Sequence, residues 1–232
     1  MSMNNYDGDT FVAFLDISGF KELMRNEEKA LDALDKLYNY GYEIIGNQNN
    51  ECRVEGIFIS DSCMLFVRNN NQSISSISES LKSLLMVIKN INKRMREKDF
   101  MLTSSIAYGK FKYQGRIEFP GIEKNLIYGN AYVSAFLDNE NGKPKIQPGQ
   151  CRITRKNLPD DIIQVIEQNQ DIDIFRMLKK RGNDNKHYYY YWMFDDPSKI
   201  ERFEQNYKDA YNLKYAGMLK TIKGDSCECH NR

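Results

Sequence analysis

Two aspartates occupy positions where a carboxylate could do chemistry. Asp16 directly follows the apolar residues 11–15, and Asp61 lies between two short strand-like segments. A short continuous apolar run predicts a strand buried on both faces, where an acid is costly unless a cation compensates its charge. Mg²⁺ and Mn²⁺ take carboxylate oxygens and keep positions for water and phosphate. We therefore expect Asp16 and Asp61 to hold divalent metal, although a single strand-end Asp is more often a helix cap or a turn residue.

The segment after the first of these strands has the composition of a tight turn that leads into a helix. Ile17, Ser18, Gly19 and Phe20 form this turn. Free N–H groups at a helix start bind phosphate oxygens, so we expect the turn from Ser18 to Phe20 to receive a triphosphate. At a two-metal site, one metal lowers the pKa of a ribose hydroxyl and the other holds the triphosphate. This arrangement favours in-line attack with release of pyrophosphate.

Hydrophobic periodicity predicts the order strand, helix, strand, strand, helix, strand in the first half of the chain. Strand-like segments cover residues 11–15, 53–59, 63–67 and 100–111, and helical spacing covers residues 21–45, with a break near Asn26, and residues 73–98. This βαββαβ order predicts an α/β (α+β) fold with a ferredoxin-like core, an antiparallel sheet with helices on one face. Asp61 then lies at the tip of a hairpin whose second strand can pair with the strand of Asp16.

Strands and helices continue after this core. We expect a helix over residues 128–138, a strand over 150–154, a helix over 160–169, an aromatic strand over 186–194 and a last helix over about 197–222. Residues 1–223 then form a single domain with its core at about 10–195, and residues 224–232 form a flexible tail.

The composition excludes several classes of protein. The chain has 33 Lys and Arg against 32 Asp and Glu, a net charge of +1, so no global field attracts DNA, RNA or an anionic membrane. No stretch reaches the roughly 20 apolar residues of a membrane span, and the N-terminus lacks the pattern of a signal peptide. We expect a cytoplasmic protein in which the five cysteines are thiols.

The ordered motifs resemble those of class III nucleotidyl cyclases, the adenylate and guanylate cyclase catalytic fold. FVAFLDISGF (residues 11–20) is similar to the family's first metal motif and ISDSCMLFV (residues 59–67) to its second, while SSIAYGKF and IYGNAYVSAF resemble its later strand and glycine-initiated helix. The resemblance implies a homodimer with active sites at the interface. It also implies that Asp16, the backbone of Ile17 and Asp61 bind two Mn²⁺ or Mg²⁺ ions.

The positions that recognise a purine base in this family differ here. Ile57 stands where purine cyclases have a lysine, and Leu126 where they have an acidic or small polar residue. Residues 133–137 lack the family's asparagine and arginine, which orient the ribose and stabilise the transition state. Ile57 and Leu126 would instead line a base pocket donated by the second subunit.

A narrower resemblance is to the pyrimidine cyclases of bacterial Pycsar antiphage systems. It rests on FLDISGFK, the SDS tip, YGNAYVSAF and the downstream PKI. This resemblance implies synthesis of 3′,5′-cyclic UMP or cyclic CMP from UTP or CTP, and a separate effector protein that responds to the product. Two alternatives stay open: a catalytically degenerate cyclase-like domain that binds nucleotides or acts as a sensor, and a cyclase that acts on purine NTPs.

Three basic residues are weaker candidates for the same site. Lys145 and Lys186 are candidates for the missing transition-state cation, and Arg53 for contact with a base edge. Each also has the simpler interpretation of a solvated surface residue. The aromatic run at residues 188–192 is expected to pack in the core rather than to stack on bases.

Overall fold

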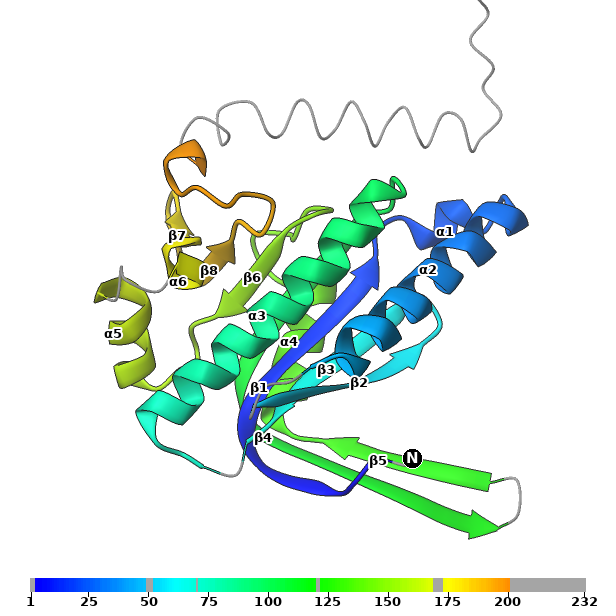
Figure 1. Ribbon diagram of the computed structural model, residues 1–232, viewed down its shortest axis with the longest axis horizontal. Coiled ribbons are helices and arrows are strands. Elements are labelled where there is room, and N and C mark those ends of the chain that lie inside the picture. The colour runs from blue at the N-terminus through cyan, green and yellow to red at the C-terminus, as the bar shows by residue number, and fades with distance from the viewer. Residues whose placement is uncertain (1–2, 49–51, 70, 120–121, 169–172, 201–232) are drawn as a thin grey trace, which may run out of the picture.

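A single sheet runs through the structure, a computed structural model that describes residues 3–48, 52–69, 71–119, 122–168 and 173–200 (Figure 1). Within these residues the strands are β1 (Tyr6–Ile17), β2 (Arg53–Ile59), β3 (Ser62–Arg68), β4 (Leu102–Phe119), β5 (Ile122–Tyr128), β6 (Cys151–Thr154), β7 (Leu178–Arg181) and β8 (Asp184–Tyr190). They lie in the order β2-β3-β1-β4-β6-β8-β7, and β5 pairs with β4. Only the β4–β6 pair is parallel among them.

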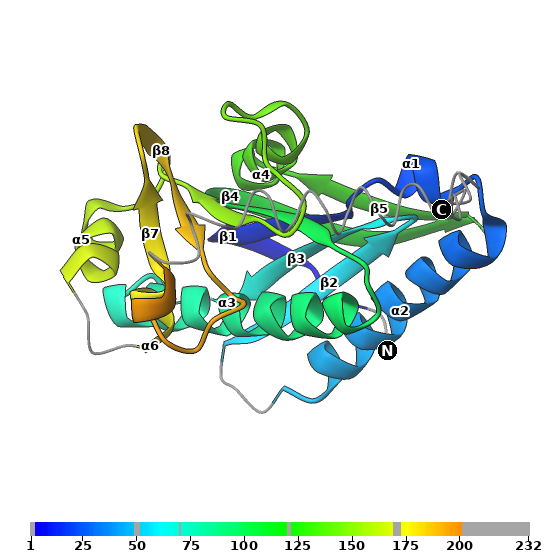
Figure 2. The ribbon, with the colours of Figure 1, turned by 90° about the horizontal axis from the view of Figure 1, so that it is seen from above.

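Helices cover both faces of the sheet. The long helices α2 (Glu27–Gly46) and α3 (Ile74–Glu97) lie on one face, and α4 (Asn130–Asn141) lies on the other (Figure 2). The short helices are α1 (Phe20–Leu23), α5 (Asp160–Gln168) and α6 (Asp173–Arg176). The main core lies between the sheet and α3, where Leu81, Leu84 and Ile88 are fully buried. A smaller apolar cluster that includes Val12 and Phe66 packs with Ala131 of α4.

The predicted βαββαβ core is confirmed. β1, β2, β3 and β4 form the antiparallel order β2-β3-β1-β4, with α2 and α3 as the two helices. The break near Asn26 is also confirmed, because the Asn26 side chain caps α2 by accepting from the Lys29 N–H at 3.1 Å. Ser73 caps α3 in the same way, by accepting from the Ser76 N–H.

The sequence patterns missed the hairpin of β4 and β5 and the short strand β7. β4 continues to Phe119 rather than ending at residue 111, and β5 occupies residues before the helix that was expected from residue 128. In Figure 1 this hairpin extends away from the rest of the sheet. β5 pairs with β4 alone, and Leu126 and Tyr128 are exposed on it. A strand without a continuous buried face lacks the alternation by which a strand is recognised.

The other predicted elements agree with the structure over most of their length. The aromatic strand is β8, which starts at Asp184 and ends at Tyr190, and the residues of the aromatic run are buried. Residues 198–200 are helical, but the rest of the expected last helix and the tail 224–232 lie outside the described residues. Cys52, Cys63 and Cys151 are buried free thiols. Among the described helices, none combines the length and apolar composition needed to cross a membrane.

A glycine sets how closely α4 approaches the sheet. Gly129 joins β5 to α4 with φ of 138°, and a Cβ there would lie 2.1 Å from the Lys110 carbonyl oxygen. We predict that Gly129→Ala lowers the free energy of unfolding by about 1–3 kcal/mol, the usual cost of such strain. The matched change Gly46→Ala, with no atom within 4 Å, should have an effect below about 1 kcal/mol. Urea denaturation compares the two variants, and equal losses would contradict this role of Gly129.

Candidate active site

The sheet brings Asp16 and Asp61 together. Asp16 is near the end of β1, opposite Ser62 of β3 on one side and Thr103 of β4 on the other. The Ile17 N–H donates to the Asp61 carbonyl oxygen at 3.0 Å, so the tip of the β2–β3 hairpin is tied to the end of β1. The predicted proximity of the two aspartates is therefore present, and their role as metal ligands stays a prediction.

The electrostatics of this pair favour a cation. Burial, together with the smaller effect of the negative charges of Asp61 and Glu140, raises the pKa of Asp16 to about 7. Within the described part of the chain, neither aspartate has an ion-pair partner. The donor set of two carboxylates and the nearby Ile17 carbonyl suits Mg²⁺ or Mn²⁺, which commonly bind one or two carboxylates and complete their coordination with water and substrate phosphates. The described residues contain no group of three acidic, histidine or cysteine side chains that could hold a metal ion.

The turn after Asp16 is only partly free to bind phosphate. The Ser18 N–H already donates to the Met101 carbonyl at 2.8 Å, so this amide is engaged within the fold, and binding of nucleotide by Ser18 stays a prediction. Its hydroxyl is buried and has no partner among the described residues. Gly19 has φ of 75°, and Phe20 begins α1, where the first N–H groups have no partner within the helix. The available donors of the turn are thus those of Gly19 and Phe20.

The C-terminal end of α4 is hydrogen-bonded to β1 and β4 beside Asp16, one of the two aspartates proposed as metal ligands and called the metal pair below. The Asn139 side chain donates to the Phe14 carbonyl at 3.3 Å and accepts from the Thr103 hydroxyl at 3.0 Å. Thr103 is the residue opposite Asp16 on β4. This contact places the next residue, Glu140, where its charge acts on Asp16. Neither Asn139 nor Glu140 was found by sequence analysis, because a polar residue at a helix end is ordinarily solvated.

The three residues proposed for the base are not gathered around the metal pair of the same chain. Arg53 begins β2, at the opposite end of the hairpin from Asp61, roughly 20 Å away at 3.3 Å per residue. Ile57 is partly buried against the apolar cluster of Met64 and Phe66. Leu126 is 38% exposed on β5. No contact among the described residues joins Ile57 or Leu126 to Asp16 or Asp61, and a base pocket donated by a second subunit stays a prediction.

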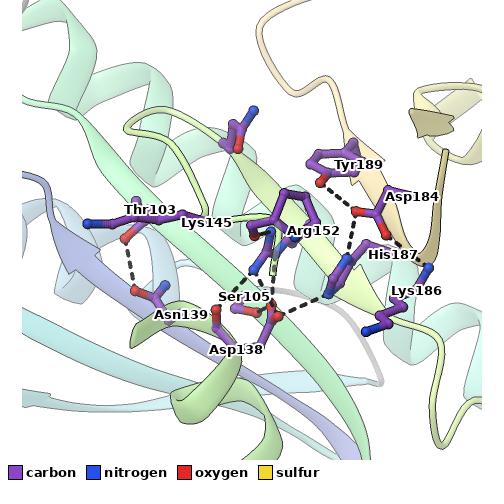
Figure 3. Close-up of polar contacts among 12 residues, drawn as sticks. Thr103, Ser105, Asp138, Asn139, Lys145, Arg152, Asp184, Lys186, His187 and Tyr189 are labelled. Carbon is purple, nitrogen blue, oxygen red and sulfur yellow. Dashed lines mark hydrogen bonds and ion pairs between the residues drawn. The ribbon is translucent and has the colours of Figure 1, made fainter. Parts of the chain in front are cut away.

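Lys145 and Lys186 lie on different sides of a buried polar network (Figure 3). Lys145 follows α4 and extends in the direction of Thr103, whereas Lys186 is on β8 beside His187. Neither touches Asp16 or Asp61 through a contact within the described chain. The structure therefore does not bring either candidate cation to the metal pair of its own chain.

The network itself is centred on Asp138, which the sequence patterns did not single out. Its carboxylate accepts from Arg152 Nε at 2.8 Å, from His187 Nε2 at 2.9 Å and from the Ser105 hydroxyl. The other ring nitrogen of His187 lies 2.8 Å from an Asp184 carboxylate oxygen. Burial alone would raise the pKa of Asp138, but these hydrogen bonds outweigh it and lower the pKa to about 2. The one signal for this network in the sequence is a charged residue, Arg152, inside a short apolar strand.

Comparisons with known proteins support a cyclase fold. Neither a protein-family model nor a curated protein matches the chain. The monomeric guanylyl cyclase domain of the RhoGC fusion protein from the aquatic fungus Blastocladiella emersonii matches with a TM-score of 0.54 and 13% identity, over 81% of this chain and 96% of that one. The guanylate cyclase domain of RhGC from Catenaria anguillulae, in complex with GTP, matches with a TM-score of 0.53 and 12% identity, over 81% and 96%.

A third solved structure is the catalytic core of a rhodopsin-guanylyl cyclase with converted specificity, in complex with ATPαS. It matches with a TM-score of 0.52 and 16% identity, over 81% of this chain and 96% of that one. At these identities the likeness shows the fold. The chain has the mixed α+β fold of guanylyl cyclase catalytic domains, with Asp16 near the end of the central strand β1 and Asp61 in the turn between β2 and β3.

We predict that the proximity of Asp16 and Asp61 lowers the stability of the folded protein when no metal is bound. Asp16→Asn removes a charge that is close to the charge of Asp61. The melting temperature of the metal-free variant should therefore be several degrees above that of the unchanged protein, because each kcal/mol of added stability raises the melting temperature of a chain of this size by about 2–4 °C. Asp9→Asn, on an exposed part of β1, is the matched control and should change the melting temperature little. A lower melting temperature for Asp16→Asn would contradict the electrostatic strain at this site.

The Asp138 network predicts a dependence of stability on pH. The pKa of Asp138 falls from an ordinary 3.8 to about 2 on folding, so its stabilisation is fully present above pH 4 and is lost as the pH falls towards 2. Asp138→Asn should lower the free energy of unfolding by about 2 kcal/mol at pH 6, with a difference that shrinks between pH 4 and pH 2. Urea denaturation across this range, with Asp9→Asn as control, measures it. A constant difference would contradict the assignment.

Proposed function

We propose that this protein is a pyrimidine nucleotide cyclase, which converts UTP or CTP to 3′,5′-cyclic UMP or cyclic CMP and pyrophosphate. The observation that carries the proposal is the pair of adjacent carboxylates, Asp16 and Asp61, without ion-pair partners within the described residues. The pair sits in a cyclase fold and is tied together through the Ile17 N–H. A partly buried acid whose pKa is raised by burial and by a second acid is more often a feature of functional sites than of stable cores.

Each residue near the pair has a defined task in this proposal. Asp16, the Ile17 carbonyl and Asp61 would hold two Mn²⁺ or Mg²⁺ ions, and the chemistry these ions would supply is activation of the ribose 3′ hydroxyl and charge neutralisation of the triphosphate. The free N–H groups of Gly19 and Phe20 orient the phosphate oxygens. Asn139 keeps the end of α4 against β1 and β4, and so fixes the position of the strand that carries Asp16.

The choice of a pyrimidine rests on what the base would meet. Ile57 and Leu126 offer no hydrogen-bonding group for the edge of a purine, and both are apolar in positions that purine cyclases fill with polar residues. A binding site discriminates most strongly against a base when binding would bury a polar group of the base or of the site without a hydrogen-bond partner. The resemblance to pyrimidine cyclases supports the same substrate and a separate effector that responds to the cyclic product in antiphage defence.

The active form in this proposal is a homodimer. Tyr128 on β5 is 52% exposed, and Val133 and Leu137 on α4 are 47% and 49% exposed. Apolar side chains that gather beside a base pocket favour burial by a second subunit. Ile57 and Leu126 of one subunit would then complete the site formed by Asp16 and Asp61 of the other.

Two other functions are supported by specific observations. The apolar residues Val133 and Leu137 on the exposed side of α4 favour a degenerate domain that binds nucleotide without turnover. The likeness to guanylyl cyclase domains, one of them in complex with GTP, fits a purine cyclase equally well.

A single assay separates the three functions. We predict that the full chain with Mn²⁺ makes cyclic UMP or cyclic CMP when it is incubated with each of ATP, GTP, UTP and CTP and the products are identified by mass spectrometry. Asp61→Ala should reduce turnover by at least about a hundredfold, because one metal loses its carboxylate. The Asp9→Ala control should keep full activity, and circular dichroism should show both variants folded.

The contrary results are equally clear. Cyclic AMP or cyclic GMP as the sole product would establish the purine alternative. Nucleotide binding without any cyclic product would establish the degenerate domain. Undiminished turnover in Asp61→Ala would show that the metal site lies elsewhere.

A further inference from the structure

A second concave site lies between α4, the segment after β6, α5 and β8. It is a pocket of about 730 Å³, within the range of small-molecule sites, and shares no lining residue with the metal pair. Leu137 and Ile163 supply apolar lining, and Arg155, Lys156 and Lys186 supply three positive charges. The pocket is thus suited to a ligand with several negative charges.

Two of the three cations of this pocket lack an ion-pair partner within the described residues, whereas Arg155 lies 3.7 Å from a Glu167 carboxylate oxygen through one terminal nitrogen. Among the described residues, Lys156 and Lys186 form no ion pair, and Arg155 Nε is buried without a hydrogen-bond acceptor. The pocket between α3 and α6 provides the contrast. Its two lysines, Lys82 and Lys89, are already paired with Glu79 and Asp195. Buried unsatisfied donors in a native structure mark places where a ligand or water belongs.

The floor of the pocket is held rigidly. Asp138 and His187 line it and belong to the buried network that joins α4 to β6 and β8. Arg155 is fixed through its own donation to the Asn185 carbonyl at 3.0 Å. Lys186 follows Asn185, and its N–H donates to the Asp184 carboxylate at 2.9 Å. The backbones that carry two of the three cations are therefore positioned before any ligand arrives, which lowers the entropic cost of binding.

We propose that Arg155, Lys156 and Lys186 bind a polyphosphate chain in this pocket. Three cations match an anion with at least three charges better than a single carboxylate, and the guanidinium of arginine suits phosphate oxygens. The proposal deepens the proposed function, since a nucleoside triphosphate is that reaction's substrate and pyrophosphate its product. The pocket supplies positive charge beside Leu137, on a helix whose residues 133–137 contain no cation.

Tripolyphosphate is the probe that tests the pocket apart from turnover. The full chain with Asp16→Asn and Asp61→Asn, without divalent metal, should bind tripolyphosphate in isothermal titration calorimetry. Adding Lys156→Ala and Lys186→Ala should weaken this binding by at least tenfold. The control pair Lys98→Ala and Lys179→Ala removes the same charge from exposed positions outside the pocket and should weaken it by less than threefold. Equal weakening by the two pairs, or no binding before either is made, would overturn the proposal.

Kinetics with intact aspartates distinguish the source of the polyphosphate. If it is the triphosphate of the substrate, the pocket variant should have a raised KM for the NTP. If it is free polyphosphate or pyrophosphate, KM stays the same, and the effect of added tripolyphosphate on the rate is lost in the pocket variant. Either result supports the pocket, whereas an unchanged KM together with an unchanged response overturns it. If the chain has no cyclase activity but binds tripolyphosphate in a way that depends on Lys156 and Lys186, the polyphosphate pocket is supported and the proposed cyclase function is rejected.

Discussion

The adjacency of Asp16 and Asp61 is the constraint on which the rest of this structure depends. β1 is paired on both edges, and the Ile17 N–H holds the Asp61 carbonyl, so the two acids cannot move apart without breaking the centre of the sheet. Burial and like charge raise the pKa of Asp16 to about 7. Such an arrangement opposes folding, and it is tolerated because the apolar core beneath it is large. A cation bound between the two carboxylates would relieve this repulsion.

Asp138 is an acid in the same protein whose pKa shifts in the opposite direction from that of Asp16. Arg152, His187 and Ser105 satisfy its carboxylate, and its pKa falls to about 2. A fully satisfied buried network fixes structure, whereas an unsatisfied pair of acids retains the capacity to bind something else. The lowered pKa of Asp138 is therefore typical of an acid that stabilises the fold, and the raised pKa of Asp16 is typical of an acid at a candidate binding site. Both are aspartates next to apolar segments, so composition alone does not distinguish them.

How far the sequence could predict this protein follows from the range of the interactions. The βαββαβ core and the meeting of the two aspartates were predictable because each strand and helix has its own hydrophobic period and its own turn or cap, as at Asn26 and Ser73. The β4–β5 hairpin was not, because β5 pairs with β4 alone and its Leu126 and Tyr128 are exposed, so they do not mark a buried face. Contacts across many residues, such as Asn139 with Phe14, depend on how α4 packs, which local patterns do not contain.

Helix α4 contacts both the strands near Asp16 and the pocket of Arg155, Lys156 and Lys186, because its inner and outer faces make different contacts. Its inner side packs Ala135 against the sheet, and its end is fastened by Asn139 to the strands of the metal pair and by Asp138 to β6 and β8. Any shift of the helix would move both attachments at once. Its outer side presents Val133 and Leu137, so positive charge for an anionic ligand has to come from neighbouring segments. Arg155, Lys156 and Lys186 lie there, in the pocket that Leu137 borders, and Asp138 and His187 of the buried network line the same pocket.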